Sequence, residues 1–165
     1  MARRLFCLTL ALLAAALCGC AGKPAANGEY AHTCAITVEC LTILDHIDDL
    51  DPDKLEVLPE DGVIIARTEV GFNDGESVYD ILRRVTAEKG VQMEASYTPV
   101  YQSAYVEGIN NLYEFDCGAL SGWTYSVNGV YPHYGCSGYY PEDGDEIIWH
   151  YTCEWMPELD GQTGE

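Results

Sequence analysis

The feature that most constrains the fold is a complete helix signal in the middle of the chain. Ser77 and Asp80 have the spacing of a capping box, in which each side chain accepts a hydrogen bond from the other residue's backbone. The apolar residues that follow recur on one helical face: Val78, Ile81, Leu82 and Val85. Gly90 stands just beyond the last turn, where a left-handed residue commonly ends a helix. The sequence therefore predicts one amphipathic helix between Ser77 and Gly90.

Strand-like stretches lie on both sides of this helix. They are rich in β-branched or aromatic residues and cover residues 35–38, 63–72, 91–97, 104–109, 122–127 and 146–151. A short second helix is predicted after the first stretch, with Thr42 and Asp45 as its capping pair and Pro52 at its end. No internal repeat is present. The predicted fold class is α+β.

The strongest turn signal is Asn128-Gly129. Both residues tolerate the positive φ angles that a two-residue hairpin turn requires. Apolar-rich arms flank the pair, so residues 122–127 are predicted to form an aromatic hairpin with Val130 and Tyr131. Pro132 stops the returning arm early.

The first residues form an export signal. Arg3 and Arg4 precede an apolar run from Leu5 to Leu17, which is too short for a stable membrane-spanning helix. The sequence Leu17-Cys18-Gly19-Cys20 resembles the lipobox of bacterial lipoproteins. That resemblance implies a signal peptide over 1–19, lipidation of Cys20, and a protein anchored by lipid to the cell membrane on its extracytoplasmic side. The alternative is an ordinary signal peptide with a chance cysteine beside its cleavage site.

Composition divides the rest of the chain into three parts. Residues 20–32 are small and contain Pro and Gly, as expected of a flexible linker that carries the lipid anchor. Residues 157–165 are polar and are expected to form a disordered tail. Residues 33–156 remain for one folded domain, which is a usual size.

Export gives the cysteines a structural meaning, because disulfides persist outside the cytoplasm. Once the leader is removed and Cys20 is lipidated, an odd number remains: Cys34, Cys40, Cys117, Cys136 and Cys153. Cys34 and Cys40 lie too far apart on one strand to bond each other. The preferred disulfide candidates are Cys117 with Cys136, and Cys40 with Cys153. Connectivity cannot be deduced from sequence alone.

Charge and motifs exclude several classes of function. The chain has 8 basic and 27 acidic residues, so a basic surface for nucleic acid is not expected. No Walker loop, zinc-protease motif or nucleophile elbow is present. We therefore expect that the protein is not an enzyme and that it requires no cofactor. Asp49, Asp51 and Asp53 match the count of a calcium loop, but Lys54 stands where that loop needs glycine. We expect no metal site.

Three parts of the chain resemble a known family. They are Gly75-Glu76-Ser77-Val78 at the helix start, the stretch from Tyr105 to Asn110, and SGWTYSVNGVYPHYGCSGYYPEDGDEIIWHYT over residues 121–152. Their order is similar to that of the transcobalamin-like C-terminal domain, which occurs in bacterial surface proteins and in vitamin carriers. The resemblance spans roughly Cys34 to Cys153. It implies a β-grasp-like fold of the soluble-ligand-binding type, with one main helix packed on a mixed β-sheet.

The resemblance also implies a function. The ligand-facing surface of the family falls here on the aromatic hairpin and the residues beside it: Trp123, Tyr125, Ser126, Asn128, Tyr131 and Tyr134. Flat aromatic faces with a few hydroxyl and amide groups suit a large ring system with polar edges. The expected function is capture of a soluble ligand for uptake, with cobalamin or another corrinoid as the bound ligand rather than as a cofactor. In the vitamin carriers a second domain completes the site, so a membrane transporter or a second ligand-binding domain is the expected partner.

Two other interpretations remain open. Trp123 and Tyr125 alternate along a strand, so both side chains could belong to the core instead of a site. The exposed aromatic hairpin would also fit a surface module that contacts a protein or a glycan and binds no small molecule.

Overall fold

The computed structural model describes residues 30–100 and 102–154. The predicted signal peptide 1–19, the lipidated Cys20, most of the linker 20–32 and the tail 157–165 lie outside the described residues. Among the helices of the described part, none is long and apolar enough to cross a membrane.

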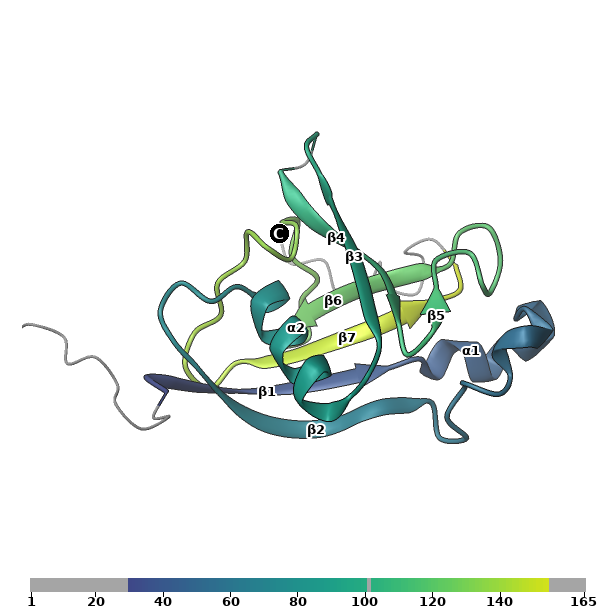
Figure 1. Ribbon diagram of the computed structural model, residues 1–165, viewed down its shortest axis with the longest axis horizontal. Coiled ribbons are helices and arrows are strands. Elements are labelled where there is room, and N and C mark those ends of the chain that lie inside the picture. The colour runs from purple at the N-terminus through teal and green to yellow at the C-terminus, as the bar shows by residue number, and fades with distance from the viewer. Residues whose placement is uncertain (1–29, 101, 155–165) are drawn as a thin grey trace, which may run out of the picture.

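A four-stranded sheet forms one layer of the domain, with the order β2-β1-β7-β6 (Figure 1). β1 (His32–Glu39) runs antiparallel to β2 (Val63–Phe72) and parallel to β7 (Glu146–Thr152). β6 (Gly122–Val127) closes the other edge, antiparallel to β7. The first and last strands of the domain are therefore neighbours at the centre of the sheet.

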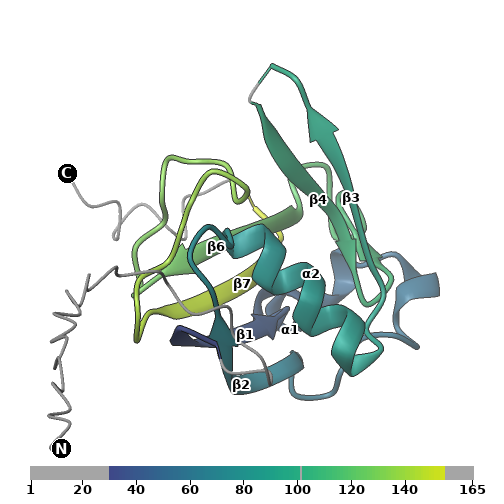
Figure 2. The same ribbon diagram turned by 60° about the vertical axis from the view of Figure 1, so that its left-hand side comes forward.

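Helix α2 (Val78–Lys89) and a second sheet lie over one face of the first sheet (Figure 2). The second sheet has three strands in the order β3 (Met93–Thr98), β4 (Ser103–Ile109) and β5 (Leu112–Tyr113). Strand β5 was not predicted, because two residues carry no periodicity. Together these elements confirm a mixed fold of few helices and mostly strands.

The predicted capping box of α2 is present. The Asp80 N–H donates to Ser77 Oγ at 3.2 Å, and the Ser77 N–H donates to the Asp80 carboxylate at 3.1 Å. The hydrogen bond from the Ser77 side chain, more than any other contact, lowers the pKa of Asp80. Gly90 caps the other end at a φ of 69°, as predicted. The predicted apolar stripe is buried.

The core lies between α2 and the four-stranded sheet. Because side chains at paired strand positions share a face, Trp123 with Tyr151 and Tyr125 with Trp149 all point to the covered face. Their rings pack closely, with Trp123 edge-on to Tyr151 at 5.2 Å and Tyr125 tilted against Trp149 at 5.4 Å. Aromatic pairs of this kind add to the free energy gained by burying their area.

The segment between β1 and β2 differs from the prediction. The helix there is a short α1 (Leu41–Asp45), followed by two 3₁₀ turns at Ile47–Asp49 and Pro52–Lys54. Thr42 does not cap it; its hydroxyl donates instead to the Tyr151 carbonyl. The predicted capping pair of Thr42 and Asp45 is wrong, because the N-cap is Cys40 and Thr42 lies inside the helix.

The start of the domain also differs slightly. β1 begins at His32, inside the predicted linker. Tyr30 belongs to the folded unit as well, because Arg84 of α2 lies over its ring at 4.7 Å. The boundary at residue 33 was therefore placed a few residues too late.

The prediction of an aromatic hairpin between residues 122–127 and Val130-Tyr131 is wrong. Asn128 and Gly129 do form a turn with φ angles of 53° and 77°, but only one bridge, between Val127 and Val130, follows it. β6 pairs with β7 along one side, over residues 122–127, and its other side carries only this bridge. Pro132 has no N–H for a further ladder bond, so the returning arm ends there.

We expect Ser77→Ala to lower the free energy of unfolding by about 1 kcal/mol, because the first turn of α2 loses its side-chain cap. The pKa of Asp80 should rise at the same time, since its main stabilising hydrogen bond is lost. Denaturant unfolding and an NMR titration measure the two effects. Ser96→Ala, at an exposed strand position, is the control. Equal stability of both variants would contradict the capping role.

Candidate ligand-binding pocket

The six residues predicted to contact a ligand do not meet in one place. Trp123 and Tyr125 are buried, with 9% and 7% of their surface exposed. The Trp123 Nε1–H donates to the Leu112 carbonyl at 2.9 Å, and the Tyr125 hydroxyl donates to the Tyr134 carbonyl at 2.8 Å. Both side chains therefore pack in the core, which agrees with the alternative that the alternating pattern left open.

Ser126 and Asn128 make bonds that hold the sheet together. Ser126 Oγ lies 2.9 Å from His150 Nε2 on the face of the sheet opposite the core. The Asn128 amide donates to the Asp145 carboxylate at 2.7 Å and accepts from the Glu146 N–H at 2.9 Å. Asn128 thus ties the turn after β6 to the start of β7.

Tyr131 and Tyr134 lie in the loop between β6 and β7. The Tyr131 ring packs against His150 at 5.5 Å, on the same side of the sheet as Ser126. Tyr134 is 69% exposed. Of the six predicted residues, Trp123 alone borders the pocket described next.

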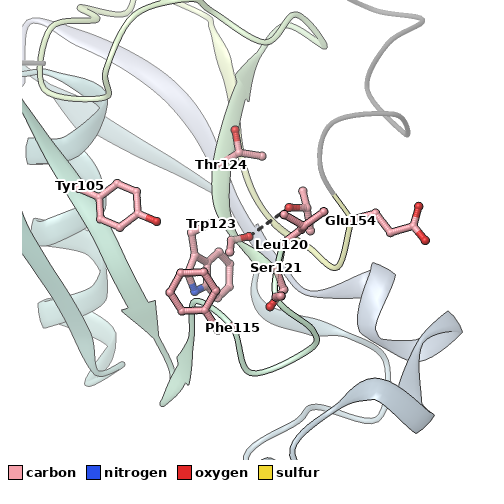
Figure 3. Close-up of a pocket in the computed structure, with 10 residues that line it drawn as sticks. Tyr105, Phe115, Leu120, Ser121, Trp123, Thr124 and Glu154 are labelled. Atoms are coloured by element: carbon pink, nitrogen blue, oxygen red, sulfur yellow. Dashed lines mark hydrogen bonds between the residues drawn. The ribbon is translucent and has the colours of Figure 1, made fainter.

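A pocket of about 410 Å³ opens between β4 and β6 (Figure 3). Tyr105 of β4 forms one side, and Glu154, just after β7, lies at the other. Trp123 and Phe115 lie between them in the view. Leu120 and Ser121 come from the loop between β5 and β6, and Thr124 from β6 itself. The volume lies in the range of small-molecule sites.

The walls of this pocket are apolar and reach the solvent. Phe115 and Leu120 are 62% and 60% exposed, although both are large hydrophobic residues. Phe115 also has a φ of 71°, a conformation that is strained for a residue with a bulky side chain. Exposed hydrophobic residues grouped around a cavity are typical of a binding surface.

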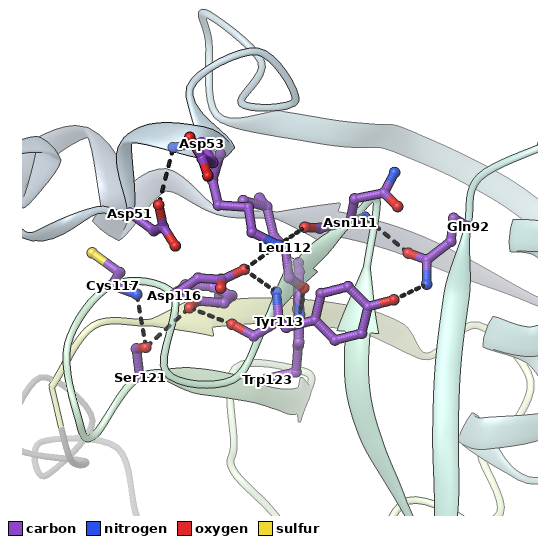
Figure 4. Close-up of polar contacts among 12 residues, drawn as sticks. Asp51, Asp53, Gln92, Asn111, Leu112, Tyr113, Asp116, Cys117, Ser121 and Trp123 are labelled. Atoms are coloured by element: carbon purple, nitrogen blue, oxygen red, sulfur yellow. Dashed lines mark hydrogen bonds and ion pairs between the residues drawn. The ribbon is translucent and has the colours of Figure 1, made fainter.

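A network of polar contacts fixes the loop that carries Phe115 (Figure 4). Lys54, from the 3₁₀ turn before β2, lies 3.0 Å from the Asp116 carboxylate and donates to the Asn111 carbonyl at 2.9 Å. Asp116 also accepts from the Tyr113 N–H at 2.7 Å. Ser121 Oγ accepts from the Cys117 N–H at 3.1 Å and lies 3.0 Å from the Tyr151 hydroxyl. The loop is therefore braced from its start to its end.

The polar groups of the pocket lie at its edges. The Tyr105 hydroxyl donates to the Glu114 carboxylate. Burial, followed by this bond, raises the pKa of Tyr105 to about 12, so its hydroxyl stays protonated at neutral pH. Glu154 adds a second carboxylate at the opposite edge. The site can offer stacking surfaces to a neutral or cationic ligand, and its acidic edges disfavour an anion.

The sequence missed Tyr105, Phe115 and Leu120 as site residues. Phe115 and Leu120 lie in a loop, where no periodicity distinguishes a site residue from a solvated one. Tyr105 lies in one of the stretches that resemble the family, but the aromatic residues of 121–152 drew the prediction away from it. A large apolar residue in a polar loop is the signal that could have been used.

The fold does not bring Cys117 and Cys136 together, although their pairing is predicted from the sequence. Cys117 Sγ lies 3.0 Å from Cys153 Sγ. Cys136 contacts the Ala104 carbonyl at 3.3 Å, and Cys40 contacts the Gly62 carbonyl at 3.4 Å. The β6–β7 pairing explains the error, because it carries the end of β7 to the loop that contains Cys117.

The described residues contain one arrangement of catalytic-type side chains and no metal-binding group. No group of three His, Cys, Asp or Glu side chains gathers there to hold a metal ion. Glu39, His150 and Ser126 form a series in which His150 Nδ1 lies 2.8 Å from the Glu39 carboxylate. The order is that of a hydrolytic triad, but Ser126 is only 2% exposed and does not line the pocket between β4 and β6. Its side chain is therefore covered by neighbouring residues in this conformation.

Trp123→Ala should lower the free energy of unfolding by about 3–5 kcal/mol, because it removes a buried ring, its contact with Tyr151 and the bond to Leu112. Tyr134→Ala is the control. Its ring is exposed, and the carbonyl that Tyr125 needs is retained, so its effect should stay within about 0.5 kcal/mol. Chemical denaturation measures both. A Trp123→Ala protein as stable as the unchanged chain would contradict the packing role of the tryptophan ring.

Comparison with known proteins gives similarity to one family and to solved structures. Residues 75–153 match a family described as "Domain of unknown function (DUF4430)", and every pocket residue except Glu154 lies within that match. A crystal structure of a "putative metal binding protein" from Ruminococcus gnavus ATCC 29149 has 13% sequence identity and a TM-score of 0.42, and the match covers 73% of this chain and 95% of the other. No curated protein matches the chain. The segment from the end of β2 to the end of β7 is thus similar to the DUF4430 domain.

Proposed function

We propose that this protein is an exported, lipid-anchored binding protein that captures a soluble ligand in the pocket between β4 and β6. The observation that supports this most is the exposure of Phe115 and Leu120 around a cavity whose inner wall is Trp123. A folded domain gains nothing from leaving such side chains in water unless something covers them. The leader and Cys20 support the anchoring, which would hold the pocket outside the membrane.

The ligand we propose is cobalamin or another corrinoid. The sequence resemblance to the transcobalamin-like domain supports this class, and the aromatic pocket suits one edge of a ring system with amide groups. A cavity of about 410 Å³ with an open side would hold only part of so large a molecule. A membrane transporter or a second ligand-binding domain would then cover the remainder and receive the ligand for uptake.

The strand order supports the finer proposal of a β-grasp-like fold. Two antiparallel pairs, β1 with β2 and β6 with β7, join through a parallel pair of β1 with β7, and α2 lies across them. In such a fold the helix covers one face and leaves the loops at the sheet ends for binding.

A second candidate function is contact with a protein or a glycan without a small molecule. The observation that favours it is the hairpin of β3 and β4, which projects from the body of the domain (Figure 2). Near its tip, Tyr97 is 64% exposed and Val100 is 83% exposed. Aromatic residues on a projecting element suit a protein interface.

The first experiment is a titration of the purified chain with cobalamin and with cobinamide, followed by calorimetry and absorbance. Saturable binding at micromolar affinity or tighter, about 8 kcal/mol, would support capture. If neither titration gives a heat of binding, the corrinoid proposal is contradicted. The function to test next is then contact with a protein or a glycan through the β3–β4 hairpin.

Leu120→Ala and Phe115→Ala should each weaken corrinoid binding by about tenfold or more, because each removes an exposed wall of the pocket. Their melting temperatures should stay close to that of the unchanged chain, since neither side chain is buried. Tyr97→Ala, on the projecting hairpin, is the matched control and should bind normally. If Tyr97→Ala weakens binding and the two pocket variants do not, the pocket is not the site.

A further inference from the structure

Two thiols from distant parts of the chain meet behind the pocket. Cys117 lies in the loop between β5 and β6, and Cys153 lies just after β7. Their sulfur atoms are 3.0 Å apart, although 36 positions separate the residues in sequence. Both residues are buried, so the packing of the fold holds the two sulfur atoms in place.

A third thiol lies near this pair: burial, followed by the neighbouring Cys153, raises the pKa of Cys40. Cys136 Sγ lies against the Ala104 carbonyl of β4, and Cys40 Sγ lies against the Gly62 carbonyl before β2. Cys34 belongs to β1, where it pairs with Val70. A metal site is a poor explanation for the Cys117 and Cys153 pair, because no group of three His, Cys, Asp or Glu side chains in the described residues is arranged to hold a metal ion.

We propose that Cys117 and Cys153 form a disulfide in the mature protein. The two thiols would lose two protons and two electrons as the Sγ–Sγ bond forms, and a small-molecule or protein disulfide would accept them and become two thiols. The bond needs the sulfurs to approach by only about 1 Å. The proposal rests on the proposed export of the chain, because such bonds persist outside the cytoplasm.

The disulfide would link two walls of the pocket. Cys117 follows Phe115 and precedes Leu120 in one wall, and Cys153 lies between Thr152 and Glu154 in the other. A covalent link between the two segments would hold those walls at a fixed separation. It would also close a long loop, which limits the freedom of the unfolded chain and raises the stability of the folded one.

The two thiols would be oxidised while the chain folds, before they are buried. Burial raises the pKa of the Cys117 thiol, so the folded chain holds little of the thiolate that attacks a disulfide. We therefore expect the bond to form while the chain folds in an oxidising compartment.

Refolding of the full chain with oxidised and reduced glutathione, followed by alkylation and peptide mapping, tests the pairing. No lysine or arginine follows Lys89, so trypsin is unsuitable. Chymotryptic cleavage at aromatic residues such as Phe72, Trp123, Tyr131 and Tyr151 separates the four relevant cysteines, Cys40, Cys117, Cys136 and Cys153, from one another. The expected product is a peptide pair that joins Cys117 to Cys153 and disappears on reduction. A pair that joins Cys117 to Cys136 or Cys40 to Cys153, or alkylation of both Cys117 and Cys153 after oxidative refolding, would overturn the proposal.

Thermal unfolding with and without dithiothreitol tests the consequence. Reduction should lower the melting temperature of the refolded chain and of Cys136→Ser, the matched control. Cys117→Ser should melt at one temperature in both conditions. If Cys117→Ser does not fold, the peptide map of the unchanged chain still decides the pairing. The mapping uses no ligand, so a failure of the disulfide and a failure of the corrinoid proposal are distinguishable.

Discussion

The parallel pairing of β1 with β7 is the interaction on which the rest of the structure depends. It joins residues 35–39 to residues 146–150, so the two ends of the domain meet at the centre of its sheet. Closing so long a loop has an entropic cost that contacts elsewhere must offset. The burial of Ile36, Val38 and Trp149 along this seam supplies part of that free energy. The intervening chain then folds over one face, which places α2 against the core and the second sheet beside it.

The core and the pocket share their side chains. Trp123 packs edge-on against Tyr151 inside the domain, yet the same ring forms the inner wall of the pocket. The Tyr151 hydroxyl donates to the Tyr113 carbonyl at 2.7 Å, in the strand that leads to Phe115. The site is therefore built directly on rigid elements, and a ligand there would contact groups whose positions the sheet already determines.

Local patterns predicted the local features of this fold. The capping box, the apolar stripe and Gly90 marked α2, and β2 begins and ends at the residues that the pattern gave. The pairing of β6 could not be predicted from the same signals, because the Asn128-Gly129 turn forms whether or not a hairpin follows it. The aromatic residues of β6 were visible in the sequence, but their burial depends on β7, which lies about twenty residues away. The predicted site residues followed the family resemblance to β6 and the turn after it, whereas the exposed walls of the pocket, Phe115 and Leu120, lie in a loop without periodicity.

The brace from Lys54 gives the segment between β1 and β2 a role beyond connecting two strands. Lys54 contacts Asp116 and the Asn111 carbonyl, so a change of length or sequence near Pro52 alters the support of a loop some sixty residues further along the chain. Related chains that differ in this connection can thus differ in the shape of their pocket while every residue facing the ligand is unchanged. Specificity in such a domain can be adjusted from a place that no ligand touches.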